Sequence, residues 1–159
     1  ALSDGISEGF VHLKNERFVT AFNEMFEPLA ALERLALLES AKHETHADGS
    51  AIIRQSSKNQ AIYVLVHGEL RIVQKVAGQE TEIARLGVGA VFGEMSFIDL
   101  EGASASVIAE GEAEVLFIDG RQINNLFATI TGFEGRFFRS LSNILSRRLR
   151  VTNMRLSWK

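Results

Sequence analysis

The middle of the chain is divided by glycines into short strand-like runs, and this pattern limits the fold more than any other feature. Nine of the 13 glycines lie between residues 44 and 120, at positions 49, 68, 78, 87, 89, 93, 102, 111 and 120. The runs between them are residues 51–54, 62–66, 69–75, 81–86, 104–109 and 114–118. Many short strands joined by glycine turns are typical of a sandwich or barrel. Residues 76–79, Val-Ala-Gly-Gln, predict the tip of a hairpin.

The segments on either side have the helical period instead. Apolar residues recur every three or four positions over residues 6–40, and Pro28 predicts the start of a second helix after one that ends near Met25. A short helix over 121–128 and a long helix from about Glu134 are expected after the strands, with Gly132 between them. We therefore expect one domain over 1–159: helices over 1–43, a β-roll over 44–120 and helices over 121–159.

The last predicted helix has two apolar stripes. Phe137, Leu141 and Ile144 can pack on the barrel. The second stripe follows a seven-residue repeat and comprises Phe138, Leu145, Leu149, Thr152 and Leu156. An unpaired stripe of this length on an exposed helix favours self-association, so we expect a homodimer through residues 137–156.

Charge is distributed unevenly along the chain. Residues 134–159 contain seven Lys or Arg and one acid, Glu134, which gives this segment a net charge of +6, whereas the whole chain has −3. Such a segment is a solvated helix face or a surface for nucleic acid or membrane. No second, turn-linked recognition helix follows residue 134, so we expect no DNA-binding domain in this chain.

Composition excludes several classes of protein. The chain has no cysteine, so disulfides, thiol nucleophiles and zinc ribbons are impossible. No apolar run approaches the roughly 18 residues of a membrane-spanning helix, and no signal peptide is visible, so we expect a soluble, cytoplasmic protein without membrane contact. His43 and His46 have no further ligand at metal-site spacing, and no Gly-x-Ser-x-Gly motif is present. We expect neither a metal nor a cofactor, and no enzymatic activity.

Residues 86–109 are the best candidate for a binding site. Three glycines, Gly87, Gly89 and Gly93, precede Glu94, which lies among apolar neighbours, and a helical turn and a run of small residues follow. Amides at such a turn can bind a phosphate, and Glu94 could accept hydrogen bonds from a sugar hydroxyl. The alternative is an internal role for Glu94 and ordinary turns at the glycines, because glycine motifs alone are weak signals.

This segment resembles the phosphate-binding cassette of cyclic-nucleotide-binding domains, of the type found in bacterial cAMP receptor proteins and in regulatory subunits of cAMP-dependent protein kinase. The similarity covers about residues 26–156. It includes residues 48–53 (Asp-Gly-Ser-Ala-Ile-Ile), 63–70 (Tyr-Val-Leu-Val-His-Gly-Glu-Leu), 92–95 (Phe-Gly-Glu-Met) and 147–152 (Arg-Arg-Leu-Arg-Val-Thr). The resemblance implies a small β-roll flanked by helices, with a long dimerisation helix at the end.

The resemblance also implies a set of ligand-binding residues. Gly93 and Glu94, followed by Met95, match the residues at the ribose 2′-hydroxyl, and Ser104 and Ala105 match those beside the cyclic phosphate. Ile72 and Ile83 match the apolar residues around the ribose and base. Thr152 matches a residue that contacts the base, and Asn153 matches a residue that reaches the base from a partner subunit. The alternative for each of these residues is a role in packing alone. Ile72 and Ile83, for example, would be core residues in any barrel.

One position departs from the family pattern. Where the family has an arginine that pairs with the phosphate, this chain has Ala103; Arg85 and Arg121 are possible substitutes. Two functions follow from the resemblance. In the first, the chain would be a regulatory module that binds a cyclic nucleotide, cAMP or cGMP, and signals through its last helix. Alternatively, it is a degenerate module of the same fold that dimerises without this ligand. Related transcription factors continue into a further effector domain, so a fragment and a free-standing domain are both consistent with the sequence.

Overall fold

Helices precede and follow an antiparallel sheet. A computed structural model describes residues 15–58, 60–94 and 102–157, with side chains up to residue 150. The first two helices are α1 (Glu16–Met25) and α2 (Ala31–Ser40). Asn15 caps α1 by accepting a hydrogen bond from the N–H of Phe18. The second helix begins at Ala31 and not at Pro28, because the chain turns between the helices before Ala30 serves as N-cap.

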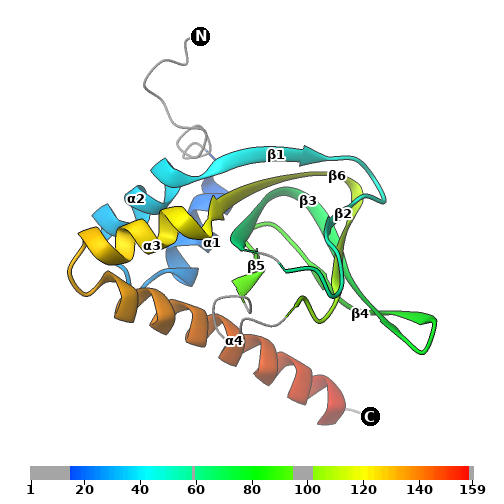
Figure 1. Cartoon of the computed structure of the whole chain (residues 1–159). Coiled ribbons are helices and arrows are strands. Elements are labelled where there is room, and N and C mark those ends of the chain that lie inside the picture. The colour runs from blue at the N-terminus through cyan, green and yellow to red at the C-terminus, as the bar shows by residue number, and fades with distance from the viewer. Residues whose placement is uncertain (1–14, 59, 95–101, 158–159) are drawn as a thin grey trace.

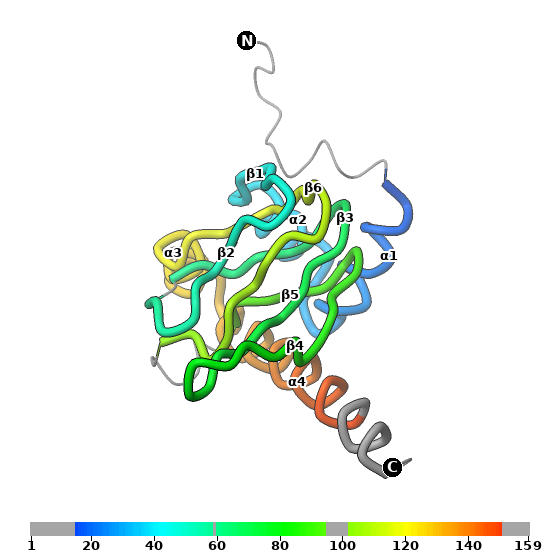
Figure 2. Tube along the Cα trace, turned by 90° about the vertical axis from the view of Figure 1, so that its right-hand side faces the viewer, coloured from blue at the N-terminus to red at the C-terminus, as the bar shows by residue number. Residues whose placement is uncertain are grey.

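In the part of the chain that the structure describes, the sheet has six strands: β1 (Lys42–His46), β2 (Ala51–Ile53), β3 (Ala61–Val76), β4 (Gln79–Leu86), β5 (Val91–Phe92) and β6 (Ser106–Asp119). Their order is β1-β6-β3-β4, with β2 paired to β6 and β5 paired to β3, and all pairs are antiparallel. The strands curl into a roll at one end of the molecule (Figures 1 and 2). The expected β-roll with flanking helices is confirmed.

β3 is one strand of 16 residues where two shorter runs were expected. Its register with β6 shifts on both sides of His67, which bends the strand without ending it. Gly68 lies at this bend with φ 99°, and a Cβ there would stand 2.7 Å from the carbonyl oxygen of Glu112. The predicted hairpin tip is confirmed: Ala77 and Gly78, both with positive φ, join β3 to β4.

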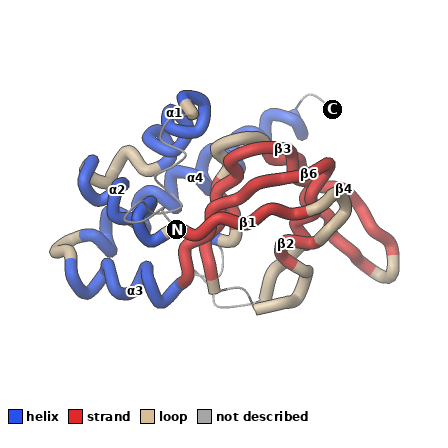
Figure 3. The backbone as a smooth tube through the Cα atoms, turned by 90° about the horizontal axis from the view of Figure 1, so that it is seen from above, coloured by secondary structure: helices blue, strands red, loops and turns tan. Residues whose placement is uncertain are grey.

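Two helices follow the sheet, α3 (Gly120–Thr129) and α4 (Phe133–Ser157). The four helices of the described residues are grouped mainly at one side of the roll, and α4 runs beneath it (Figures 1 and 3). Phe137, Leu141 and Ile144 of α4 are buried with the N-terminal helices and with one face of the sheet, as their spacing predicted. No described helix is long and apolar enough to cross a membrane.

The sheet separates two apolar cores. The outer core joins the helices to strand residues such as Ile62, Val64 and Leu116. The inner core fills the roll and contains Ile53, Leu65, Leu70, Phe92, Val107, Ala109, Ala113 and Val115. Because side chains alternate along a strand, each strand contributes to both sides of the sheet.

Candidate functional site

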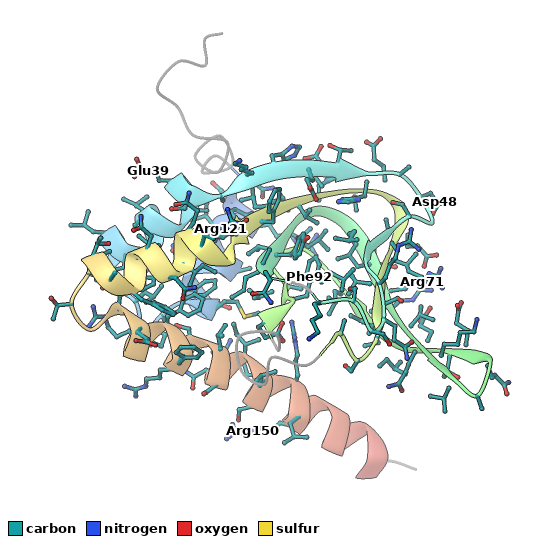
Figure 4. The ribbon with its side chains drawn as sticks, viewed as in Figure 1. Glu39, Asp48, Arg71, Phe92, Arg121 and Arg150 are labelled. Atoms are coloured by element: carbon teal, nitrogen blue, oxygen red, sulfur yellow. The ribbon has the colours of Figure 1, made fainter. Side chains whose placement is uncertain are left out.

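The predicted acidic residue, Glu94, is buried at the end of β5. Val91 and Phe92 pair with β3, and Gly93 follows with φ 83°, a conformation that favours glycine. Glu94, which follows this glycine, is only 2% exposed. Phe92 on β5, labelled in Figure 4, is buried in the inner core. A carboxylate this deeply buried requires hydrogen-bonding partners.

Arg148 supplies that partner from α4. Its Nη1 donates to Oε1 of Glu94, and its Nη2 donates to the carbonyl oxygen of Val91. The guanidinium therefore connects the last helix both to β5 and to the turn that follows β5. Sequence reasoning missed this role of Arg148. The available signal was its place on the long helix one turn before Thr152, because residues four apart lie on the same face of a helix.

The second half of the predicted cassette is attached to the loop after β2. The N–H of Ser56 donates to the carbonyl of Ala103 (2.7 Å), and the N–H of Ala103 donates to the carbonyl of Ser57 (2.8 Å). Ser104 is exposed, and its carbonyl accepts a hydrogen bond from Nε2 of Gln74. Ala105 is buried. Ser104 is thus accessible from solvent, and Ala105 next to it packs into the protein; their contact with a ligand stays a prediction.

The two isoleucines lie where a bulge interrupts the β3–β4 pair. Ile72 pairs with Ala84 and Val73 pairs with Glu82, so Ile83 is the extra residue of the bulge. Ile72 is half-buried against the inner core, and Ile83 is 50% exposed. Their apolar surface therefore borders the inside of the roll, and Ile83 remains accessible.

Neither of the two candidate arginines replaces the arginine that the family has at the position of Ala103. Arg85 makes ion pairs with Glu82 (2.9 Å), Glu69 (2.7 Å) and Glu110, and these contacts raise the pKa of Arg85 above its ordinary value. Arg121 lies in the first turn of α3, on the helical side of the molecule (Figure 4). Among the described residues, the cation found at the cassette is Arg148, and it is bound to Glu94.

Other predicted residues lie outside the site or outside the described part of the chain. Met95 is outside the described residues, and Thr152 and Asn153 lie on α4 with side chains that are also outside them. His43 contacts Glu114 and His46 contacts Glu44. Within the described ranges, no group of three His, Asp or Glu residues is arranged to hold a metal ion.

Comparison with known proteins supports the resemblance. Residues 43–130 match the family described as the cyclic nucleotide-binding domain. The chain is 30% identical over 133 residues to the cyclic AMP receptor protein of Thermus thermophilus, a match that covers 83% of this chain and 60% of that protein. It is 25% identical over 113 residues to the cAMP-dependent protein kinase regulatory subunit of Mycosarcoma maydis, over 68% of this chain and 22% of that protein.

A solved structure agrees with the sequence matches. The crystal structure of the Thermus thermophilus catabolite activator protein superposes with a TM-score of 0.68 at 31% identity, covering 84% of this chain and 62% of that one. The chain thus spans less than two thirds of the length of these relatives. With the roll, the buried Glu94 and the family match in agreement, the chain belongs to the cyclic nucleotide-binding domain family.

Proposed function

We propose that this chain binds cAMP in the pocket bordered by Gly93–Glu94, Ser104–Ala105, Ile72 and Ile83. The observation that carries the proposal is the buried carboxylate of Glu94, held at the edge of the inner core. A carboxylate is an acceptor for hydrogen bonds, and the ribose 2′-hydroxyl of a cyclic nucleotide is a donor. The half-buried Ile72 and accessible Ile83 offer an apolar surface to the ribose and base.

The contact between Glu94 and Arg148 supports a route by which the ligand could act on α4. A ribose hydroxyl that donates to Glu94 shares the carboxylate with Arg148, and this changes the electrostatic environment of the guanidinium. Since Arg148 lies on α4 and also binds the carbonyl of Val91, its rearrangement would alter how α4 rests on the sheet. The signal therefore passes from the cassette to the last helix through one ion pair.

The exposed stripe on α4 supports a homodimer through residues 137–156. Leu149 is 62% exposed, and Phe138 and Leu145 on the same stripe are half-buried. A second copy of α4 would cover these side chains. By the family resemblance, the partner subunit would then contribute Asn153 to the base, so the dimer would complete the pocket.

A second candidate function follows from Ala103. Truncating one partner of a buried charge pair typically costs about 2–5 kcal/mol, and every 1.4 kcal/mol is a factor of about ten in affinity. Arg85 is fully engaged with glutamates and cannot compensate without losing them. This observation favours a degenerate module that dimerises or senses another molecule, with cyclic-nucleotide affinity about tens to thousands of times weaker than an arginine-containing pocket.

Thermal unfolding with cAMP, cGMP and 5′-AMP separates the two functions. A ligand that binds only the native state raises the Tm; at one hundred times Kd it contributes about 2.7 kcal/mol, or about 5–10 °C for a chain of this size. We expect a saturable rise with cAMP that 5′-AMP does not produce and that Glu94→Gln abolishes. An unchanged Tm with millimolar cAMP and cGMP would contradict the proposal and leave the degenerate module.

A further inference from the structure

A hollow on the outer face of the roll lies apart from the cassette carboxylate. It has a volume of about 750 Å³, within the range of small-molecule sites. Val73 and Ile108 form its floor, on neighbouring strands β3 and β6. Val107 and Ala109 point into the inner core, so Ile108 between them points to the opposite face. Helices α1–α3 lie at the other end of the molecule (Figures 1 and 3).

Charged side chains surround this hollow without neutralising one another. Arg54, Lys75 and Glu80 border it, and none of the three makes an ion pair with another residue in the described ranges. Lys75 and Glu80 remain unpaired even though they are cross-strand neighbours. The local charge is therefore +1, and two cations face the same space.

The adjacent part of the same sheet face shows the opposite behaviour. Its charges join in one cluster, formed by Glu69, Arg71, Glu82, Arg85 and Glu110. Figure 4 places Arg71 of this cluster at the strand end of the molecule, away from the helices. Charged residues on this face of the sheet can therefore form ion pairs with one another. At the hollow, by contrast, Arg54 and Lys75 are left to bind another partner.

Hydrogen bonds hold the walls of the hollow in place. The side-chain amide of Gln55 donates to the carbonyl of Lys75 (3.0 Å) and accepts from its N–H (2.8 Å), which ties the loop after β2 to β3. The N–H of Gln55 donates to Oγ of Ser106, whose own hydroxyl hydrogen remains available to a ligand. A site whose walls are fixed in advance loses less entropy on binding.

We propose that this hollow binds a small organic anion that also carries a hydroxyl group. The phosphate or carboxylate lies between Arg54 and Lys75, the carbon body rests on Val73 and Ile108, and the hydroxyl donates to Glu80. The proposal for this hollow does not rest on cyclic-nucleotide binding. It is nevertheless connected to the cassette, because the loop that carries Arg54 continues into Ser56 and Ser57, which are hydrogen-bonded to Ala103.

Amide NMR titration with 3-phosphoglycerate tests the site, with inorganic phosphate and glycerate as separate arms and ionic strength held constant. With 3-phosphoglycerate, we expect saturable amide chemical-shift changes at residues 54–57, at residue 75 and at Ala103. The same Kd should be obtained at each of these places. Inorganic phosphate and glycerate alone should bind at least fivefold more weakly. Arg54→Gln and Lys75→Gln should each weaken binding at least fivefold.

Two matched variants locate the binding. Lys58→Gln removes a neighbouring exposed cation that does not line the hollow, and Glu94→Gln alters the cassette carboxylate. Both should bind 3-phosphoglycerate as the wild type does. The proposal is overturned if millimolar 3-phosphoglycerate causes no saturable shift, if phosphate alone binds equally well, or if binding survives Arg54→Gln and is lost in Glu94→Gln.

Discussion

At the scale of single residues, Glu94 and Ala103 would have opposite effects on binding of the proposed nucleotide. Glu94 is a buried acceptor that is already in place and bound to Arg148. Ala103 lies between two main-chain hydrogen bonds to the loop after β2 and packs against the inner core with no charge to offer. The ribose side of the proposed pocket is thus complete, and the phosphate side lacks a cation.

Ala103→Arg should therefore tighten cAMP binding at least tenfold, which is about 1.4 kcal/mol. A guanidinium at this position can make charge-assisted, bidentate hydrogen bonds with the cyclic phosphate. Isothermal titration measures the gain. Ala103→Gln, a long side chain without charge, is the matched control and should change the Kd less than about threefold, since a charge-assisted hydrogen bond is roughly twice as strong as a neutral one.

Glu94→Ala in the Ala103→Arg background should remove most of the gain by deleting the ribose acceptor. If the Ala103→Arg variant keeps the wild-type Tm and still gives no heat with cAMP or cGMP, the cyclic-nucleotide assignment is wrong.

Residues near the cassette differ in how well the sequence predicts them. Gly93 and Glu94 follow from a local motif, and the structure gives the glycine a positive φ and buries the carboxylate. Arg148 is 54 residues away from Glu94 in sequence, and only the packing of α4 on the sheet brings them together. Arg85 could be proposed only as a nearby cation, and its ion pairs with Glu69 on the neighbouring strand and with Glu82 on its own strand show that it has another role.

At the scale of elements, an ion pair fixes α2 to α4. Nε of Arg136 donates to Oε1 of Glu33 (2.9 Å), Nη2 donates to Oε2, and Nη2 also donates to the carbonyl of Thr131. Glu33 is only 5% exposed and also accepts from the N–H of Ala30 at the start of α2. The contact therefore caps one helix and anchors another with the same carboxylate.

Arg136→Gln should lower the free energy of unfolding at pH 7, because it leaves the buried carboxylate of Glu33 without its charged hydrogen-bond donor. The hydrogen bond from Arg136 is the main cause that holds the pKa of Glu33 below its ordinary value of 4.5. Because the folded-state pKa is the lower one, this stabilisation is present above about pH 4.5 and is lost as the pH falls below it.

Urea unfolding at neutral and acidic pH measures this effect. The difference between wild type and Arg136→Gln should shrink toward zero in acid. Arg139→Gln, an exposed arginine on the same helix, is the control and should stay within about 0.5 kcal/mol of wild type. A difference that is equal at both pH values would mean that Glu33 is not the partner through which Arg136 stabilises the fold.

β1 and β5 were not predicted from the sequence, because neither strand has a hydrophobic pattern. β1 has the sequence Lys-His-Glu-Thr-His and contains no apolar residue, so its pairing with β6 leaves no hydrophobic pattern. β5 has two residues, which is too short for any period. The long helices and the β3–β4 hairpin were predictable because period and turn chemistry are local properties.

At the scale of the whole molecule, the described chain has one face that lacks a partner. Figure 1 shows α4 running beneath the roll and away from it toward its C-terminal end, and Leu149 on this helix is largely exposed. The side of α4 that carries Phe137, Leu141 and Ile144 is fully used in the outer core. The remaining stripe is therefore available to a second copy of the chain.

Sedimentation at micromolar concentration should give about twice the chain mass of 17.6 kDa if α4 pairs with a second α4. Leu149→Glu places a charge in the seam and should shift the protein toward the monomer. Asn143→Glu, an exposed position on another face of α4, should leave the dimer intact. A wild-type protein that sediments as a monomer would contradict the proposed dimer.

Hydrogen exchange with and without saturating cAMP tests the central claim most directly, because it reports on the cassette and on α4 in one experiment. The account predicts slower exchange in residues 91–94 and a change in residues 141–150, with 5′-AMP inactive. In Arg148→Gln, the protection of 91–94 should persist while the change in α4 disappears. Identical exchange of the wild-type protein with and without millimolar cAMP would contradict ligand binding at Glu94 and its transmission to α4.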